Sequence, residues 1–121
     1  MAVEALAAEG NYFHIYEFFI KIDIDPQTFV AKFNEFDYSP DNPMHKSNAQ
    51  VKDGVLVQDV TNSLHFWLIA EWRDIQEHAR IRKLLAEVLK PEFVSMIEGS
   101  KGFIPAYGKI VSATPHEVLN R

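Results

Sequence analysis

The chain has 121 residues, of which 47% are hydrophobic and 24% charged, with a formal net charge of -5. This length fits one domain, and the composition is that of a globular protein. The acidic balance provides no basic stripe for nucleic acid, the lack of cysteine excludes disulfides and thiol chemistry, and no apolar run approaches the roughly 20 residues that span a bilayer.

The chain divides into three segments. Residues 1–12 form an Ala-rich leader that lacks the basic and apolar regions of a signal peptide, so we expect the leader to be flexible and the protein to be cytoplasmic. Residues 13–111 hold most of the aromatic and β-branched residues and are expected to form the domain. Residues 112–121 form a tail that we expect to become ordered only against a partner.

The first strand and the first helix follow the leader directly. Residues 13–24 are rich in aromatic and β-branched side chains, which is typical of a strand. Asp25 is a good helix N-cap, Pro26 suits the first helical position, and the apolar residues that follow recur at helical spacing. Turn formers from residue 38 onward end this helix and open a loop that runs to Asn48.

A β-hairpin is predicted next. Residues 55–60 and 64–72 are apolar runs, and the turn formers at 61–63 join them. An alternative places an extra turn at Asp53-Gly54.

The remaining residues predict a second helix and a last strand. Asp74 and Glu77 have the spacing of a capping box, and the apolar pattern that follows is interrupted at Pro91 and ends at Gly99. Residues 103–111 form the last strand, in which a proline and a glycine indicate an edge or a bulge. The predicted fold is therefore α+β, with the ferredoxin-like order βαββαβ and both helices on one face of an antiparallel sheet.

This sheet carries large apolar side chains on both faces. Side chains alternate between the faces of a strand, so a sheet with water on one side should alternate apolar and polar residues. In the first and third strands, one face holds His14, Tyr16, Phe18, Ile20, Ile22, Ile24, Phe66, Leu68, Ala70 and Trp72. The other holds Phe13, Ile15, Glu17, Phe19, Lys21, Asp23, His65, Trp67, Ile69 and Glu71. The two helices can cover one face only, so we expect a homodimer that covers the other. The alternative is a monomer whose outer face is a tolerated mixture of apolar and charged groups.

Charged residues indicate which face meets the second copy. A charge is costly against the protein's own helices, but it can pair or stay hydrated between subunits. The predicted dimer interface is therefore Glu17, Phe19, Trp67, Ile69 and Glu71. By elimination, the opposite face looks toward the helices, where a pocket within the chain would form.

One segment carries a resemblance to a known family. From Phe66 to His78, an apolar strand ends at Glu71-Trp72 and runs directly into a capped helix, which resembles the antibiotic biosynthesis monooxygenase family of the dimeric α+β barrels. The order of elements agrees with that family over residues 13–111. The resemblance implies a cofactor-free oxygenase of polyketide quinone precursors, a haem-degrading oxygenase or a protein of unknown role, with Trp72 lining the pocket.

Two positions depart from the family pattern. Leu68 stands where some quinone-forming members carry Asn, four residues before the Trp. Ile81 stands where many members carry His, nine residues after it. The oxygenation residues of those members are incomplete here, and so is a haem-ligand set that uses the second His.

The predicted site is an aromatic pocket with two histidines at its polar end. His14 and His78 are the candidate catalytic residues. The predicted substrate-binding residues are Tyr16, Phe18, Phe66, Leu68, Trp72 and Tyr107. A cofactor-free oxygenase needs a base that ionises a phenol, apolar walls that hold a flat ring, and donors for developing negative charge. The alternative is that His14 is a core residue, that His78 lies on the helix surface, and that Trp72 and Tyr107 serve packing.

Glu17 and Glu71 are expected on adjacent strands, where a two-fold axis would gather them into a carboxylate cluster. The alternative, which we prefer, is a hydrated rim with Lys21 or His65 as counter-charge. The five histidines have no metal-ligand spacing, so we expect no metal. The chain also lacks the P-loop, GxGxxG and GxSxG motifs.

Three functions stay open. The first is a small-molecule enzyme without a cofactor, either a monooxygenase or a cyclase, that acts on an aromatic or polyketide-like compound. The second is a non-catalytic dimeric module that binds an apolar ligand or a protein through the same pocket and the loop over residues 40–48. The third is a haem-binding or haem-degrading protein.

Overall fold

The computed structural model describes residues 2–88, 94–100 and 105–121. The elements are β1 (Tyr12–Phe19), α1 (Pro26–Asp37), η1 (Pro43–Lys46), β2 (Gln50–Asp59), β3 (Asn62–Trp72), α2 (Ile75–Val88), η2 (Glu98–Ser100), β4 (Ala106–Lys109) and α4 (His116–Leu119). The strands form one antiparallel sheet in the order β2-β3-β1-β4. The fold is α+β, and this order is consistent with a ferredoxin-like arrangement.

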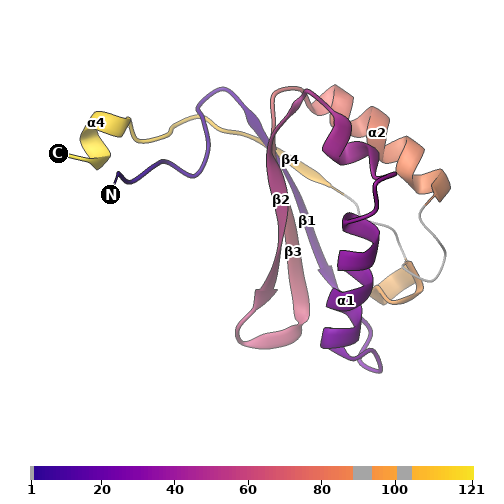
Figure 1. The fold of residues 1–121 in the computed structure, drawn as a ribbon. Helices are drawn as coiled ribbons and strands as arrows, with labels where there is room; N and C mark the ends of the chain where they lie inside the picture. The colour runs from indigo at the N-terminus through magenta and orange to yellow at the C-terminus, as the bar shows by residue number, and fades with distance from the viewer. Residues whose placement is uncertain (1, 89–93, 101–104) are drawn as a thin grey trace.

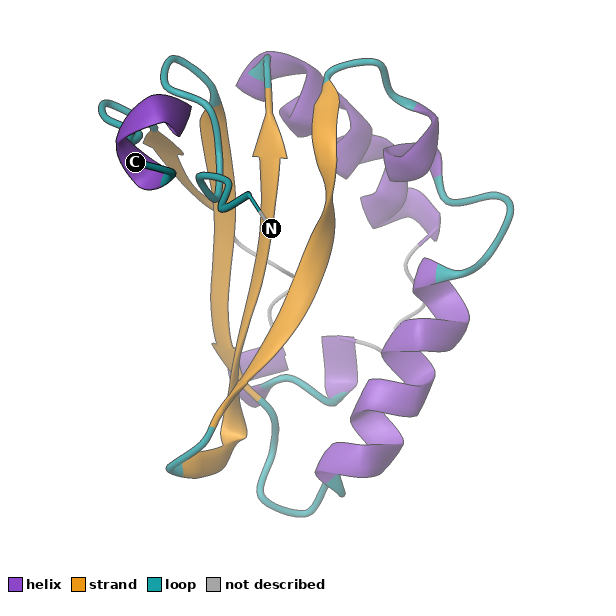
Figure 2. Ribbon diagram, turned by 60° about the vertical axis from the view of Figure 1, so that its left-hand side comes forward, coloured by secondary structure: helices purple, strands orange, loops and turns teal. Residues whose placement is uncertain are grey.

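The helices and the terminal segments lie on opposite sides of the sheet. Figure 1 shows α1 and α2 on the same face, with α2 at the upper end of the sheet and α1 at the lower end, while both chain ends project on the other side. The same separation is visible after rotation in Figure 2. None of the helices in the described part of the chain has the length and hydrophobicity needed to cross a membrane.

The first helix begins where the sequence predicts. The Asp25 carboxylate accepts hydrogen bonds from the Thr28 backbone N–H at 3.2 Å and from the Thr28 hydroxyl at 3.0 Å, and Pro26 is the first helical residue. Phe29, from the buried face of α1, packs against Phe18 and Phe66 of the sheet with ring centroids 5.6 and 5.2 Å away. The cap and the aromatic stripe together place α1 on the sheet.

The first strand is shorter than predicted. β1 ends at Phe19, and the Lys21 N–H donates to the Met96 carbonyl while the Ile24 N–H turns back to the Lys21 carbonyl. Ile22 is 89% exposed. The prediction of a strand to residue 24 was therefore wrong, since β3 begins at Asn62 and residues beyond Ile22 would have no strand to pair with.

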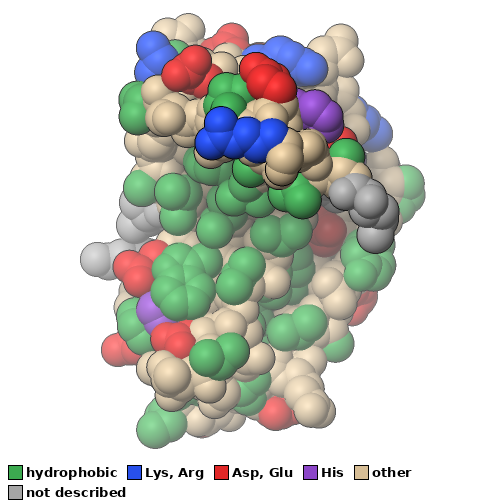
Figure 3. Space-filling model, turned by 90° about the vertical axis from the view of Figure 1, so that its left-hand side faces the viewer, with side chains coloured by type: hydrophobic (Ala, Val, Ile, Leu, Met, Phe, Trp, Pro, Cys, Tyr) green, Lys and Arg blue, Asp and Glu red, His purple; other side chains and the backbone are tan. Residues whose placement is uncertain are grey.

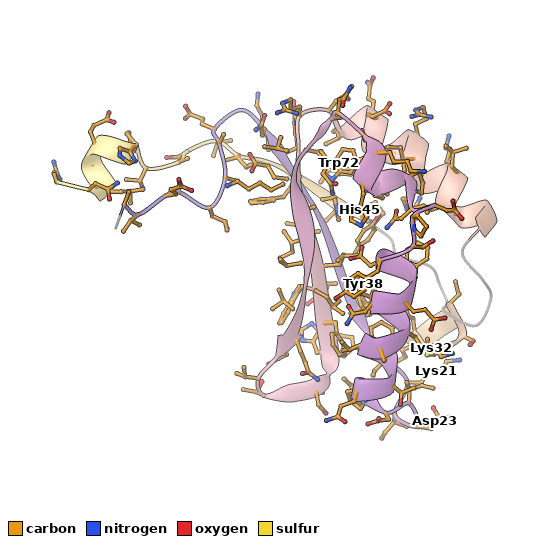
Figure 4. All side chains as sticks on the ribbon, viewed as in Figure 1. Lys21, Asp23, Lys32, Tyr38, His45 and Trp72 are labelled. Carbon is orange, nitrogen blue, oxygen red and sulfur yellow. The ribbon has the colours of Figure 1, made fainter. Side chains whose placement is uncertain are left out.

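Two charged residues that the sequence predicts on the first strand lie off the sheet. Lys21 and Asp23 lie in the turn beside the start of α1, as Figure 4 shows, and not on the outer face of β1. The outer face is consequently more apolar than the sequence predicts.

The hairpin is longer than predicted, and its turn is tighter. β2 begins at Gln50 and continues through Asp53-Gly54 with register shifts on either side of Lys52, so the alternative of an extra turn there was wrong. A Cβ atom on Gly54 would lie 3.3 Å from the Ala70 Cβ atom and from the Ile69 carbonyl oxygen, so glycine lets the bulged strand approach β3 closely. The turn itself is Val60-Thr61.

The second half of the fold follows the prediction in part. The Asp74 carboxylate caps α2 by accepting from the Gln76 N–H at 2.9 Å, while Glu77 pairs with Arg80 and not with the cap, so the capping box is half formed. β4 is an edge strand, as predicted, although it ends at Lys109. The predicted break at Pro91 and the predicted strand residues 103 and 104 lie outside the described residues.

Candidate functional site

His78, in the first turns of α2, lies at the centre of a buried polar cluster. Its Nδ1 atom is 2.8 Å from the Tyr107 hydroxyl of β4, and its Nε2 atom is 3.3 Å from the Tyr16 hydroxyl of β1. The side chain is fully buried beneath α2. Asp74 caps α2 and so fixes the residue at which the helix begins. The cap thereby also fixes where along the sheet the His78 imidazole lies.

Two further aromatic side chains enclose this imidazole. The His14 ring stacks on the His78 ring with centroids 4.3 Å apart and planes 19° apart. Trp72 approaches the same ring edge-on, at 4.9 Å and 74°. Strands β1, β3 and β4 and helix α2 all contribute to this cluster. They bring together five of the residues that the sequence predicts for the site, namely His14, Tyr16, Trp72, His78 and Tyr107.

Burial keeps both histidines neutral at neutral pH. It lowers the pKa of His14 to about 3, to which the nearby His78 contributes, and lowers the pKa of His78 to about 4, to which the charge of Arg82 contributes. Burial also raises the pKa values of Tyr16 and Tyr107, so both hydroxyls keep their protons. The cluster thus holds a neutral base between two protonated phenols.

Arg82 belongs to this site, although the sequence analysis did not select it. It lies one helical turn beyond His78 on α2 and hydrogen-bonds to the Tyr16 hydroxyl. The i to i+4 spacing from His78 was the signal that could have identified it. Of the two neutral tautomers of His78, the one protonated at Nε2 donates to the Tyr16 oxygen and accepts from the Tyr107 hydroxyl at Nδ1, and the other reverses both hydrogen bonds.

Two buried nitrogen atoms of the cluster have no hydrogen-bond partner among the described residues. They are the His14 Nδ1 atom and the Trp72 Nε1 atom. A buried polar atom without a partner costs about 1–3 kcal/mol. These two atoms are therefore the positions in the cluster where a polar group of a ligand would gain most.

Three predicted pocket residues lie elsewhere. Phe18 and Phe66 belong to the hydrophobic cluster around Phe29, and Leu68 packs against that same cluster. These side chains hold α1 on the sheet, whereas the histidine cluster lies under α2. Ile81, which departs from the family pattern, packs beside Trp72.

Tyr107 is the member of the cluster that meets solvent, with 37% of its surface exposed. Two clefts of about 510 Å³ each lie away from it. One is between η1 and α2, with Asn48, Arg80 and Ile81 in its walls, and the other is between α1 and β2, with Phe33 and Leu56 in its walls. Neither is lined by His14 or His78. Within the described ranges, no three His, Asp or Glu side chains are grouped so that they could hold a metal ion.

A further histidine, His65, lies on the outer face of the sheet between two carboxylates. The His65 Nδ1 atom is 2.9 Å from Asp59, and its Nε2 atom is 2.8 Å from Glu17. Phe19 stacks on the His65 ring at 4.3 Å, and Trp67 lies at 4.1 Å on a tilted plane. His65 therefore pairs with Glu17, as the preferred alternative predicts for that carboxylate, whereas Glu71 does not lie on a hydrated rim.

Glu17 and Glu71 do not form a carboxylate cluster in the chain. Glu17 lies opposite Trp67, whereas Glu71 lies opposite Phe13, four residues further along β3. Glu71 is buried under the leader, and one of its oxygens accepts from the Ala8 N–H at 2.9 Å and from the Asn11 side-chain amide at 2.8 Å. The predicted interface residue Glu71 is thus covered by its own chain, while Phe19 is exposed.

With the geometry established, the chain was compared with known proteins. No protein-family model matches it, and neither the curated proteins nor the solved structures yielded a significant match.

The neutral histidines predict that acid destabilises the fold. In the unfolded chain His14 takes up a proton near pH 6.5, while the folded chain takes it up only near pH 3. The unfolded state therefore binds more protons between these values, and the free energy of unfolding falls as the pH decreases, by at most about 1.4 kcal/mol per pH unit from His14. His78 acts in the same direction. Urea unfolding between about pH 5 and pH 6.5, where carboxylates contribute little, measures this slope, and His14→Gln should make it shallower. An unchanged slope in that variant would contradict the burial of a neutral His14.

The pairing of His65 predicts the opposite pH dependence, in which the free energy of unfolding falls as the pH rises. Hydrogen bonds to Asp59 and Glu17 raise the pKa of His65 above 6.5, against the smaller effect of burial. Its stabilising contribution is therefore complete below pH 6.5 and is lost as the pH rises through the raised pKa. NMR titration of the His65 ring should give a pKa above 6.5, and Glu17→Gln should lower it. A value at or below 6.5 in the unmodified chain would refute the pairing.

Proposed function

We propose that the chain is a small-molecule enzyme, a cofactor-free monooxygenase that uses His78 as a general base on an aromatic, phenol-bearing substrate. The observation that carries this proposal is the Tyr107 hydroxyl, a phenol that lies 2.8 Å from the Nδ1 atom of a neutral histidine. The cluster therefore already holds one phenol in the position that proton abstraction requires.

The proposed proton path begins at the exposed end of the cluster. A substrate hydroxyl that reaches Tyr107 passes its proton to the Tyr107 oxygen as Tyr107 passes its own to His78. The resulting imidazolium donates from Nε2 to the neutral Tyr16 oxygen, which also lies within the influence of Arg82, and the negative charge is left on the substrate oxygen. Tyr107 does not have to ionise in this path, because it receives one proton as it gives up another. The path is therefore compatible with burial, which raises the pKa of Tyr107.

The oxygen chemistry belongs to the substrate and to molecular oxygen. Loss of the phenol proton makes the ring electron-rich enough to reduce O₂. In the overall reaction the substrate loses its phenol hydrogen and one ring C–H hydrogen, the ring carbon becomes C=O, one atom of O₂ enters the product, and the other leaves as water with these two hydrogens. His14 and Trp72, which enclose the His78 ring, would keep bulk water from the protonated imidazole.

The same proposal includes assembly as a dimeric α+β barrel of the antibiotic biosynthesis monooxygenase type. Support comes from the strand order and from the outer face, where Phe19 and Val55 are exposed and Trp67 is only half-buried. Because Lys21 and Asp23 lie off this face, the apolar surface left for a second copy is larger than the sequence indicates.

A non-catalytic binding module is the second candidate. The observation that favours it is the burial of both histidines, since neither imidazole is exposed to a ligand in the described part of the chain. In this alternative a ligand would bind against the exposed Tyr107 without proton transfer.

Haem does not fit the cluster. Both nitrogens of His78 are engaged by tyrosine hydroxyls, and the face of its ring is covered by His14 at 4.3 Å. An axial ligand needs a free nitrogen with open space in front of it. We therefore do not propose His78 as a haem ligand.

Removal of one hydroxyl tests the proposed catalysis. Tyr107→Phe keeps the ring but removes the donor to His78, so kcat/KM for oxygen uptake should fall about 100-fold. An oxygen electrode with a panel of dihydroxy-aromatic compounds measures this rate. Tyr38→Phe, at the exposed end of α1 (Figure 4), is the matched control and should leave the rate unchanged. If no compound promotes uptake while several raise Tm, the binding module replaces the enzyme.

A substitution on the outer face tests the dimer. Light scattering at micromolar concentration should give about twice the chain mass of 13.9 kDa for the unmodified protein. Trp67→Glu should reduce this to the single-chain mass, because it places an unpaired charge in the centre of the apolar face. Tyr38→Glu, on the helix side, should remain a dimer. A single-chain mass for the unmodified protein would exclude the assembly.

A further inference from the structure

The two ends of the chain form one structural unit, which we call the terminal arm (residues 2–11 and 110–121). At its base, the Gly10 N–H donates to the Ile110 carbonyl and the Ile110 N–H donates to the Asn11 carbonyl, both at 2.8 Å. At its tip, the Asn120 side chain accepts from the Val3 N–H at 2.6 Å and donates to the Val3 carbonyl at 2.8 Å. The leader and the tail are therefore joined at both ends.

The outer face of the sheet sets the direction of this arm. The buried Glu71 carboxylate holds Ala8 and Asn11, and the Lys52 ammonium donates to the Leu6 carbonyl at 3.0 Å. All of these bonds lie on the side away from α1 and α2, and Figure 1 shows the arm projecting on that side. The arm thus leaves the body from the face that has no helix cover.

Both the arm and the outer face expose apolar side chains. On the arm, Leu6 is 81% and Val111 77% exposed, and Val3 and Val118 are also exposed. On the outer face, the exposed apolar side chains are Phe19, Val55 and Val57. Figure 3, which faces this side of the molecule, shows hydrophobic side chains gathered beneath the arm. The arm extends past this surface and leaves it open.

The total surface area indicates how much is left to bury. A compact monomer of this mass exposes about 6,700 Å², whereas this chain exposes 8053 Å². The excess of about 1,400 Å² is a total over the whole chain, to which the projecting arm contributes; each partner buries roughly 800 Å² in a standard interface. Burial of the arm against a second copy would bring the exposed area closer to that of a compact protein.

We propose that the terminal arm crosses to a second copy of the chain and packs its apolar side chains, chiefly Leu6 and Val111, on that copy's outer face. One chain supplies both the arm and the receiving surface, so a two-fold axis buries both arms in a single reciprocal exchange. This inference rests on the face-to-face dimer of the proposed function and adds a distinct contact to it. The arm acts as a clasp that closes around the partner.

Charge substitutions at the clasp test this contact. Leu6→Glu and Val111→Glu should each raise the dissociation constant of the dimer at least tenfold, because each places a charge in a surface that the partner covers. Sedimentation equilibrium of the full chain measures the constant, and circular dichroism verifies the fold of each variant. Val60→Glu is the matched control, since Val60 is fully exposed at the β2–β3 turn and should leave the constant within twofold.

A labelled thiol gives a second measurement on the same contact. The chain has no cysteine, so Leu6→Cys provides a unique attachment point for an environment-sensitive dye. Dilution through the dissociation constant should shift the emission to longer wavelength as the arm enters water, whereas a dye at Val60→Cys should show no shift.

The outcomes separate the clasp from the dimer itself. If the unmodified chain is a monomer, the dimer of the proposed function is wrong and the clasp with it. If it is a dimer that Trp67→Glu dissociates, while Leu6→Glu and Val111→Glu leave the constant within twofold and the Leu6 dye does not respond, the clasp is overturned and the dimer stands.

Discussion

The sheet has two apolar faces, and the chain has two long helices with which to cover one of them. The composition of the core, the position of the buried polar site and the exposed apolar surface all depend on which face the helices cover. Toward α1, Phe29 packs into a hydrophobic cluster with Phe18 and Phe66. Toward α2, the covered face includes His14 and Tyr16, so polar atoms are buried along with the aromatic rings. The uncovered face keeps its apolar groups next to water, and there the chain ends project from the body.

The buried polar atoms under α2 give the site its chemical character. Desolvation removes the charge from both histidines, and Arg82 opposes a return of positive charge on His78. The same guanidinium lowers the pKa of the tyrosines against the larger effect of burial. Among the described residues, the cluster thus combines a neutral base, two phenols and one cation without a carboxylate, and the lowered pKa of His78 disfavours its protonated form. These pKa shifts favour a His78 that passes a proton on over one that retains it.

Local patterns in the sequence predict the parts of this fold that depend on local physics. The Asp25 cap, the alternation of β1 and the proximity of His14, Tyr16, Trp72 and His78 all follow from spacing. The end of β1 does not, because the residues up to Ile24 have strand propensity, and only the position of β3 denies them a partner. The burial of Glu71 also could not be predicted, since the groups that cover it come from a leader with no pattern of its own. Arg82 was missed because a helical arginine usually lies in water.

β4 connects two regions of the molecule that are otherwise separate. This strand is four residues long and pairs with β1 alone; it carries Tyr107 and passes directly into Ile110 at the base of the arm. Ile110, with its hydrogen bonds at the base of the arm, therefore lies three residues after Tyr107. The position of the hydroxyl that reaches His78 depends on the same short strand that anchors the chain ends.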